Sequence, residues 1–263
     1  MSLTRYAPQI IDAFRMTVAR PVAAAAIMLP GLALVAGGHL LGAGGSSALA
    51  PVALMLPTLA ITAMGFFWQR VLAEGEDLTP LQMAPRMILW MIILQLLQGF
   101  ELAPTILFGL LLKDTPNAEV YTRTGIQLFQ LLIGGLFLIL PQLALGKWRD
   151  LAGTKLQEMV LTAGIAVGLG YVVINLPFML AGEIAKGLFA DFAPNAGQST
   201  VSLVLEVLHA LNVVVVAGYF ALVWTQLKDA PSRLALAADP EQPAEEPKER
   251  RTTRINRTTK AKR

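Results

Sequence analysis

Glu101 is the residue whose type and surroundings could support chemistry, because it is an acid inside a long apolar stretch. A charged carboxylate within hydrocarbon costs roughly 2.5–3.5 kcal/mol on insertion scales, so the group must be protonated, paired or in contact with water. Gln95, Gln98 and Thr105 fall within about 120° of it on a helical wheel. Pro104 follows and removes one backbone hydrogen bond, which predicts a kink. The stripe is a candidate substrate path.

A second polar stripe follows on the next apolar stretch. Its members share one helical face: Gln127, Gln130, Gly134, Pro141 and Gln142. If the two stripes face each other, they could line a polar path through the membrane. The alternative is hydrogen bonding between packed helices, which is worth about 0.6 kcal/mol on average.

Glu206 and His209 are spaced i, i+3, and Asn212 lies one turn further on. Glu-x-x-His can supply two ligands to a di-iron site, but that site needs a second such pair, which the sequence lacks. His39 is the only other histidine, so a haem held by two histidines is conceivable on composition. The plainer alternatives are that Glu206 and His209 pair with each other or face water. We therefore predict no metal and no cofactor.

The elements that carry these residues are apolar runs of about membrane-spanning length. The chain is 55% hydrophobic and only 15% charged, whereas soluble domains carry about 25% charged residues. We expect six transmembrane helices at these approximate bounds: Pro21–Leu41, Ala48–Trp68, Met87–Leu112, Gly125–Gly146, Met159–Gly182 and Val201–Leu227. Runs near twenty residues span about 30 Å of hydrocarbon. The predicted class is an all-α, polytopic membrane protein.

Two glycines on the fifth predicted helix form a small-xxx-small face. Gly164 and Gly168 lie four residues apart, and such a face lets another backbone approach closely. Packing within one chain is preferred here over a dimer interface.

Basic residues predict the orientation. Before the C-terminal tail, eight Lys and Arg residues fall on one side of the six predicted helices and three on the other. Cytoplasmic loops are the ones enriched in these residues, so both termini are expected in the cytoplasm. The four tryptophans fall near the same helix ends, which predicts interfacial anchors.

The ends of the chain differ from its middle. Residues 1–20 form a predicted amphipathic arm, in which Ile10, Phe14, Thr17 and Val18 share a face that could lie on the membrane. Residues 21–228 form the transmembrane domain. Residues 229–263 are expected to be a disordered cytoplasmic tail. Its segment Lys248 to Arg263 holds eight basic residues and could bind anionic lipid; nucleic acid is not the expected partner.

Two loops resemble each other, one at Trp68–Met83 and one at Trp148–Met159. Thr79 with Gln82, and Thr154 with Gln157, have the spacing of a capping box, which predicts that each loop opens a helix. The end of the sixth helix at Trp224 could be a truncated third copy. The six helices would then be three repeated helical hairpins, although chance remains the alternative for such common residues.

The first of these loops carries a resemblance. Its residues are Trp68, Arg70, Leu72, Glu74 and Gly75. In this setting the chain resembles uncharacterised six-helix bacterial inner-membrane proteins. The segment from Arg15 to Pro21 is also faintly similar to the start of YIP1-type membrane proteins, which usually have five spans. The resemblance implies a multi-pass, non-enzymatic protein of the bacterial inner membrane.

Three functions follow from these observations. The preferred hypothesis is a non-catalytic scaffold, assembly factor or membrane organiser with a membrane-protein partner, because the sequence has no phosphate-binding loop and no nucleophile motif. The first alternative is a small permease or channel with a polar path around Glu101. The second is an integral-membrane enzyme that uses Glu206 and His209.

Overall fold

The computed structural model describes residues 7–43, 48–112, 115–116, 118–147, 154–192 and 198–228. The elements in these ranges are α1 (Ala7–Ala19), α2 (Pro21–Ala43), α3 (Ala50–Leu72), α4 (Pro80–Leu111), α5 (Ala118–Ile133), η2 (Gly134–Leu138), α6 (Ile139–Leu145), α7 (Thr154–Phe192) and α8 (Gln198–Lys228). All of the described elements are helices, so the predicted all-α class is confirmed.

Six of these segments are long and apolar enough to cross a membrane, which confirms the polytopic prediction. They are Pro21–Gly42, Ala50–Leu72, Pro80–Leu111, Val120–Leu145, Lys155–Phe189 and Thr200–Lys228. Many large apolar side chains on their outer faces are exposed, among them Leu96, Phe100 and Ile106 on α4. Exposed apolar surface of this extent suits a lipid environment.

Several spans begin earlier than the sequence predicted, and for α4 the reason is that its cap opens the spanning helix itself. Helix α4 begins at Pro80, where the Thr79 backbone N–H donates to Gln82 Oε1 over 3.0 Å. Proline suits the first helical position, since its missing N–H would have no partner there. Helix α7 begins at Thr154, but the Thr154 side chain and residues 148–153 lie outside the described residues. The loop repeat therefore stays a prediction.

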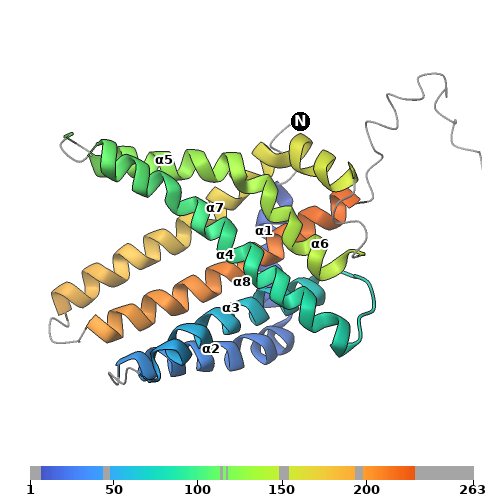
Figure 1. Ribbon diagram of the computed structural model, residues 1–263, viewed down its shortest axis with the longest axis horizontal. Helices are drawn as coiled ribbons and strands as arrows, with labels where there is room; N and C mark the ends of the chain where they lie inside the picture. The colour runs from blue at the N-terminus through green and yellow to red at the C-terminus, as the bar shows by residue number, and fades with distance from the viewer. Residues whose placement is uncertain are drawn as a thin grey trace, which may run out of the picture. The chain divides into compact units, whose positions relative to one another are not determined.

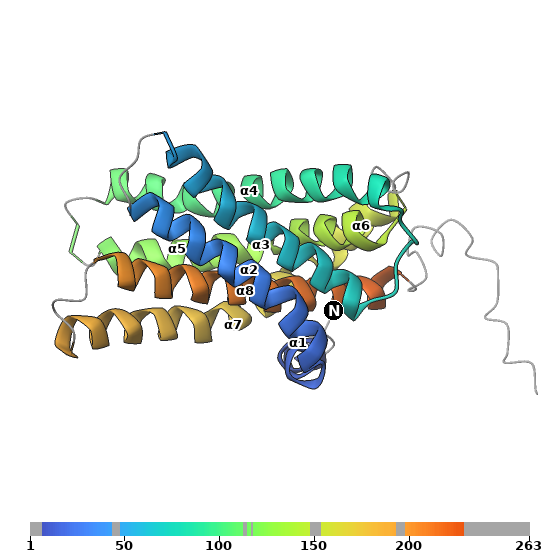
Figure 2. The ribbon, with the colours of Figure 1, turned by 90° about the horizontal axis from the view of Figure 1, so that it is seen from below.

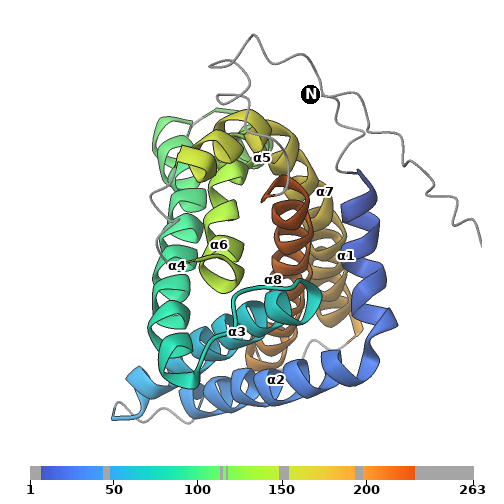
Figure 3. The same cartoon turned by 90° about the vertical axis from the view of Figure 1, so that its right-hand side faces the viewer.

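The spans pack as consecutive hairpins around α8. Helices α2 and α3, α4 and α5, and α7 and α8 are contacting pairs. The last residues of α2, α4 and α7 lie at the same end of the bundle as the first residues of α3, α5 and α8 (Figures 1 and 2). Seen along the bundle, α8 lies between α7, α3 and α6 (Figure 3). It contacts α1, α2, α3, α6 and α7, so its residues reach most of the interior.

The fourth span changes from α-helix to a 3₁₀ turn at η2, where two glycine pairs bring backbones together. A Cβ added to Gly134 would lie 2.2 Å from the Gly168 Cα, and one on Gly135 would lie 2.6 Å from the Gly164 Cα. No side chain fits between the two segments. Gly164 and Gly168 thus contact this break in the same chain, and the tighter 3₁₀ geometry occurs at the point of contact.

Helix α1 packs against the bundle through the face that the sequence assigned to the membrane surface. Ala13 is fully buried, and the Phe14 ring stacks on Phe178 of α7 with centroids 6.3 Å apart. Gln9 Nε2 donates to Gln226 Oε1 of α8 over 2.9 Å. Val18, predicted on the same face, is exposed. An apolar stripe can be covered by protein as well as by lipid, and sequence periodicity cannot distinguish the two.

The tryptophan prediction is wrong for three of the four residues. Trp68 and Trp90 are 0% exposed and Trp224 is 4% exposed, so these indoles lie in the protein core and not against headgroups. Trp148 lies outside the described residues, as does the basic segment Lys248 to Arg263. The position of an indole near a helix end does not by itself say whether the ring points to lipid or to another helix.

Candidate functional site

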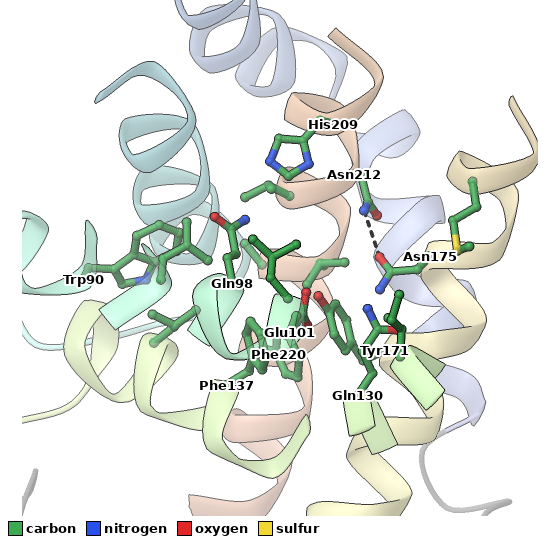
Figure 4. A pocket seen from close by; sticks show the side chains of 18 of the residues that line it. Trp90, Gln98, Glu101, Gln130, Phe137, Tyr171, Asn175, His209, Asn212 and Phe220 are labelled. Carbon is green, nitrogen blue, oxygen red and sulfur yellow. Dashed lines mark hydrogen bonds between the residues drawn. The ribbon is translucent and has the colours of Figure 1, made fainter. Parts of the chain in front are cut away.

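A cavity of about 380 Å³ lies among α4, α5, η2, α6, α7 and α8, and its lining is mostly apolar. This volume falls within the range of roughly 300–1,000 Å³ that ligand pockets occupy. The polar residues that line it are Gln98, Glu101, Thr105, Gln130, Tyr171, Asn175, His209 and Asn212. They come from α4, α5, α7 and α8, and Figure 4 shows that side chains among them, such as Glu101, Tyr171 and Asn175, point into one space.

Glu101 supplies the acid of the cavity. Its carboxyl group is approached by the Tyr171 hydroxyl of α7 and by the Gln130 amide of α5 (Figure 4). Its Oε1 atom is buried and makes no hydrogen bond of regular geometry to the residues that the structure describes. A buried acceptor without a hydrogen bond costs free energy, so this atom calls for a water, a proton donor or a ligand.

A pair of asparagines bridges α7 and α8 at the cavity wall. Asn212 Nδ2 donates to Asn175 Oδ1 over 2.8 Å (Figure 4). The Asn212 Oδ1 atom is buried and has no hydrogen-bond partner in the described part of the chain. The cavity therefore holds two buried oxygens without regular hydrogen bonds, and both are acceptors.

Aromatic rings form the remaining wall. Phe137 lies 4.9 Å from Tyr171 and 5.2 Å from Phe220, measured between ring centroids. Tyr171 and Phe220 are 5.6 Å apart, so the three rings form one cluster. Trp90 adds an indole from α4. These rings are rigid, and their faces carry partial negative charge.

The cavity has two ionisable side chains of the usual pH range, Glu101 and His209, among its described lining residues. Among the described residues that line it, Glu101 is the only carboxylic acid, and neither Lys nor Arg occurs. His209 lies on α8 at an exposed position of the wall.

Four residues lie between the cavity and the α3–α4 connection, and we call them the tryptophan–glutamine layer: Gln69, Trp90, Gln142 and Trp224. Trp90 Nε1 donates to Gln69 Oε1 over 3.0 Å, and Trp224 Nε1 donates to Gln142 Oε1 over 2.9 Å. Gln69 Nε2 in turn donates to the Ala217 carbonyl over 3.2 Å. The layer is buried and its indoles and glutamine oxygens are paired, so it closes this end of the cavity.

Beyond this layer lie Arg70, Arg86 and Glu76, and we call these three residues the arginine clamp. Arg86 is 6% exposed. Its Nη1 donates to the Gly146 carbonyl over 2.7 Å, and its Nη2 lies 2.6 Å from Glu76 Oε2. A cation at the carbonyl end of a helix is favoured by the helix dipole, so Arg86 stabilises the end of α6.

Arg70 acts on the same helix end. Its Nη1 donates to the Ala144 carbonyl over 2.6 Å, and its Nη2 donates to the Glu76 carbonyl over 3.0 Å. A Cβ on Gly75 would lie 2.8 Å from the Leu145 Cα, so glycine lets the loop lie directly on α6. Two of the loop residues that carried the sequence resemblance, Arg70 and Gly75, therefore hold the α3–α4 connection against α6.

The structure brings together only part of the predicted substrate path. Glu101, Gln98 and Gln130 line the cavity. Gln95 is exposed and pairs with Gln98 over 3.4 Å, outside the lining, and Gln127 is not among the lining residues either. Each polar stripe covers a wider arc of its helix than the part of that helix that lines the cavity.

The weak metal candidates Glu206 and His209 are directed to different partners. Glu206 Oε1 lies 3.5 Å from His39 Nδ1 of α2, whereas His209 lines the cavity. In the part of the chain that the structure describes, no three His, Asp or Glu side chains come together as a metal site would require.

Sequence reasoning missed Tyr171 as a site residue and treated Asn175 only as a sign of a kink. Both are buried on α7 and face the cavity. The available signal was their polarity within an apolar span, since such residues usually face the bundle interior.

No known protein family, curated protein or solved structure matches this chain, so the family resemblance stays a prediction from the residues quoted for it.

Proposed function

We propose that this protein is a small permease, and that its solute passes through the cavity around Glu101. The observation that carries the proposal is the buried Glu101 carboxyl, with its unpaired Oε1 atom, in a ligand-sized space between spanning helices. A scaffold, assembly factor or membrane organiser, which the sequence favoured, has no use for such a group. Ionisable residues inside spans usually mark substrate or ion pathways.

The depth of Glu101 supports this role. At about 1.5 Å per residue, it lies about 15 Å along α4 from Leu111 and about 31 Å from Pro80. A charge at that depth is costly, and a chain that only organises other proteins would gain stability from leucine there. The polar neighbours Gln98, Tyr171 and Asn212 surround the same space and could replace water around a passing solute.

The two ends of the cavity are unequal. The tryptophan–glutamine layer and the arginine clamp close the end near the α3–α4 connection, where their polar groups are paired. We infer that this resting form admits solute from the opposite side. Release would require the layer to open, as alternating access demands of any carrier.

The proposed setting is the bacterial inner membrane, with both termini in the cytoplasm. The orientation rests on the excess of Lys and Arg on that side, and the membrane rests on the resemblance quoted above. A reporter that is active only in the periplasm, fused after residue 228, should stay inactive; activity there would reverse the orientation.

Flux through purified protein tests the proposal. Proteoliposomes would be loaded with a mixture of small amines, alcohols, carboxylates and sugars, and the solutes that escape would be measured by mass spectrometry. We expect at least one solute to leave faster than from protein-free vesicles. Glu101→Leu should abolish that flux, with the same melting temperature or a higher one. Glu183→Leu, at an exposed acid of α7, is the matched control.

Two results would overturn the permease proposal. One is the absence of flux for every solute in the mixture from folded protein. The other is flux that Glu101→Leu leaves unchanged. Either result would return the protein to the scaffold class, in which the cavity is a packing defect.

A further inference from the structure

The cavity has a chemical preference that can be read from the atoms it leaves unpaired. Glu101 Oε1 and Asn212 Oδ1 are both buried and without regular hydrogen bonds among the described residues. The amide oxygen can only accept, and so can the carboxyl oxygens when Glu101 is ionised. A ligand that satisfies them must donate hydrogen bonds. An anion would bring more acceptors into a space that already has too many.

We propose that the cavity binds a small organic cation, with its ammonium group at Glu101 and its apolar part against the aromatic wall. The inference rests on the proposed function, since it names the class of solute for the same cavity. An ammonium group offers up to three donors and no acceptor. It also supplies the positive charge that a buried carboxylate requires.

The aromatic wall supports the same assignment. Trp90, Phe137, Tyr171 and Phe220 line the cavity, and the faces of such rings attract cations. The Trp90 indole is held in place by its hydrogen bond to Gln69, 3.0 Å long, so its face needs no reordering when a ligand arrives. A preformed wall reduces the entropy that binding costs.

Other classes of ligand fit less well. Phosphates and carboxylates are usually held by Arg, Lys or clustered backbone N–H groups, and neither Lys nor Arg occurs among the described lining residues. A bare divalent metal ion needs several acidic or imidazole ligands, whereas the described lining holds Glu101 and His209 alone. An organic monocation needs only one carboxylate.

Three probes of equal shape test the charge preference. Full-length protein in lipid nanodiscs would be titrated calorimetrically with 2-phenylethylammonium, 2-phenylethanol and phenylacetate, with empty nanodiscs as the blank. We expect the ammonium compound to bind at least tenfold more tightly than the alcohol, and phenylacetate to show no saturable binding. n-Butylammonium should also bind, but more weakly, because it lacks a ring.

Glu101→Gln keeps the shape of the side chain and removes its charge. We expect it to weaken 2-phenylethylammonium binding at least tenfold, and to weaken binding of the alcohol by a smaller factor. The control is Glu183→Gln, which removes an exposed acid that pairs with Lys186 on the outside of α7. It should bind like the unaltered protein. Circular dichroism would confirm that both variants keep their helices.

Several outcomes would overturn the cation assignment. They are equal or tighter binding of the alcohol or of phenylacetate, unchanged binding in Glu101→Gln, and no saturable binding of either ammonium compound. Failure here is distinct from failure of the permease. Flux of a neutral solute that depends on Glu101 would leave the permease standing with another substrate class, whereas tight cation binding without flux would indicate a receptor.

Discussion

The cavity and the arginine clamp differ in whether their buried polar groups have hydrogen-bond partners. In the clamp, Arg86 is nearly inaccessible, yet its guanidinium meets the Gly146 carbonyl and the Glu76 carboxylate at 2.7 and 2.6 Å. In the cavity, Glu101 and Asn212 each keep a buried oxygen without a regular hydrogen bond to the described residues. Paired polar groups hold helices together, whereas a buried polar atom without a partner needs another explanation, and the one proposed here is a ligand.

The tryptophan–glutamine layer belongs with the clamp. Trp90 serves both regions, because its ring faces the cavity while its N–H pairs with Gln69. Substitutions on the two sides of this residue should therefore have different consequences. Changes in the clamp and layer should reduce the free energy of unfolding, and changes at Glu101 should reduce binding without that loss.

The largest effect on stability is expected at Arg86. Arg86→Met would leave the Gly146 carbonyl and the Glu76 carboxylate without this partner, at a cost of roughly 3 kcal/mol in the free energy of unfolding. Thermal unfolding in detergent would measure it. Arg15→Met, at an exposed arginine of α1, is the control and should change little. Equal melting temperatures for the two variants would mean that the clamp is not structural.

A loss of roughly 1–3 kcal/mol is expected from Gly134→Ala, because overpacking of this size costs about that much. The new Cβ would lie 2.2 Å from the Gly168 Cα, and backbone on both sides cannot rotate away. Gly109→Ala is the control, since a Cβ there meets nothing within 4 Å. If both alanines were neutral in chemical unfolding, the close approach at η2 would be contradicted.

Trp90→Phe sharpens the comparison at the boundary between the regions. It keeps an aromatic ring in the cavity wall but removes the donor to Gln69, which is fully buried. An orphaned buried acceptor costs about 1–3 kcal/mol. We expect a fall in melting temperature, and a combined loss with Gln69→Leu that is smaller than the sum of the two single losses, since only the bond from Gln69 to the Ala217 carbonyl is lost in addition. Fully additive losses would show that the pair does not interact.

The smallest change in stability is expected at Glu101. Glu101→Gln removes a charge that has no cationic partner among the described lining residues, so the free energy of unfolding should shift by no more than about 0.5 kcal/mol, or rise. Chemical unfolding of the same samples used for calorimetry would measure it. A loss as large as that of Arg86→Met would place Glu101 in the structural class and break the contrast.

Sequence periodicity and composition were enough for the fold class, because a run of apolar residues has few alternatives to a spanning helix. They also singled out Glu101, Gln98 and Gln130, since polar residues inside apolar spans are costly unless they face the interior. Gln95 and Gln127 share their helical faces but not the cavity. A helical wheel shows which face of a helix a side chain lies on. How much of that face lines a cavity depends on how the neighbouring helices pack against it.

Other features could not be read from the sequence. The role of Arg70 and Arg86 depends on the end of α6, which is some sixty or more residues away in the chain. The same holds for the pairing of His39 with Glu206, since sequence spacing suggested His209 as the partner. Long-range contacts of this kind follow from how the hairpins pack, and local patterns do not encode them.

Cysteine accessibility tests the central contrast most directly, because the natural chain contains no cysteine. Gln98→Cys would put a thiol in the cavity, and Ala221→Cys would put one in the fully buried core of α8. In native membranes we expect the thiol at Gln98 to react with a cationic methanethiosulfonate reagent, and faster than with an anionic one, while the thiol at Ala221 stays unmodified. If both thiols were equally inert, the cavity would be closed to water and the account would be wrong.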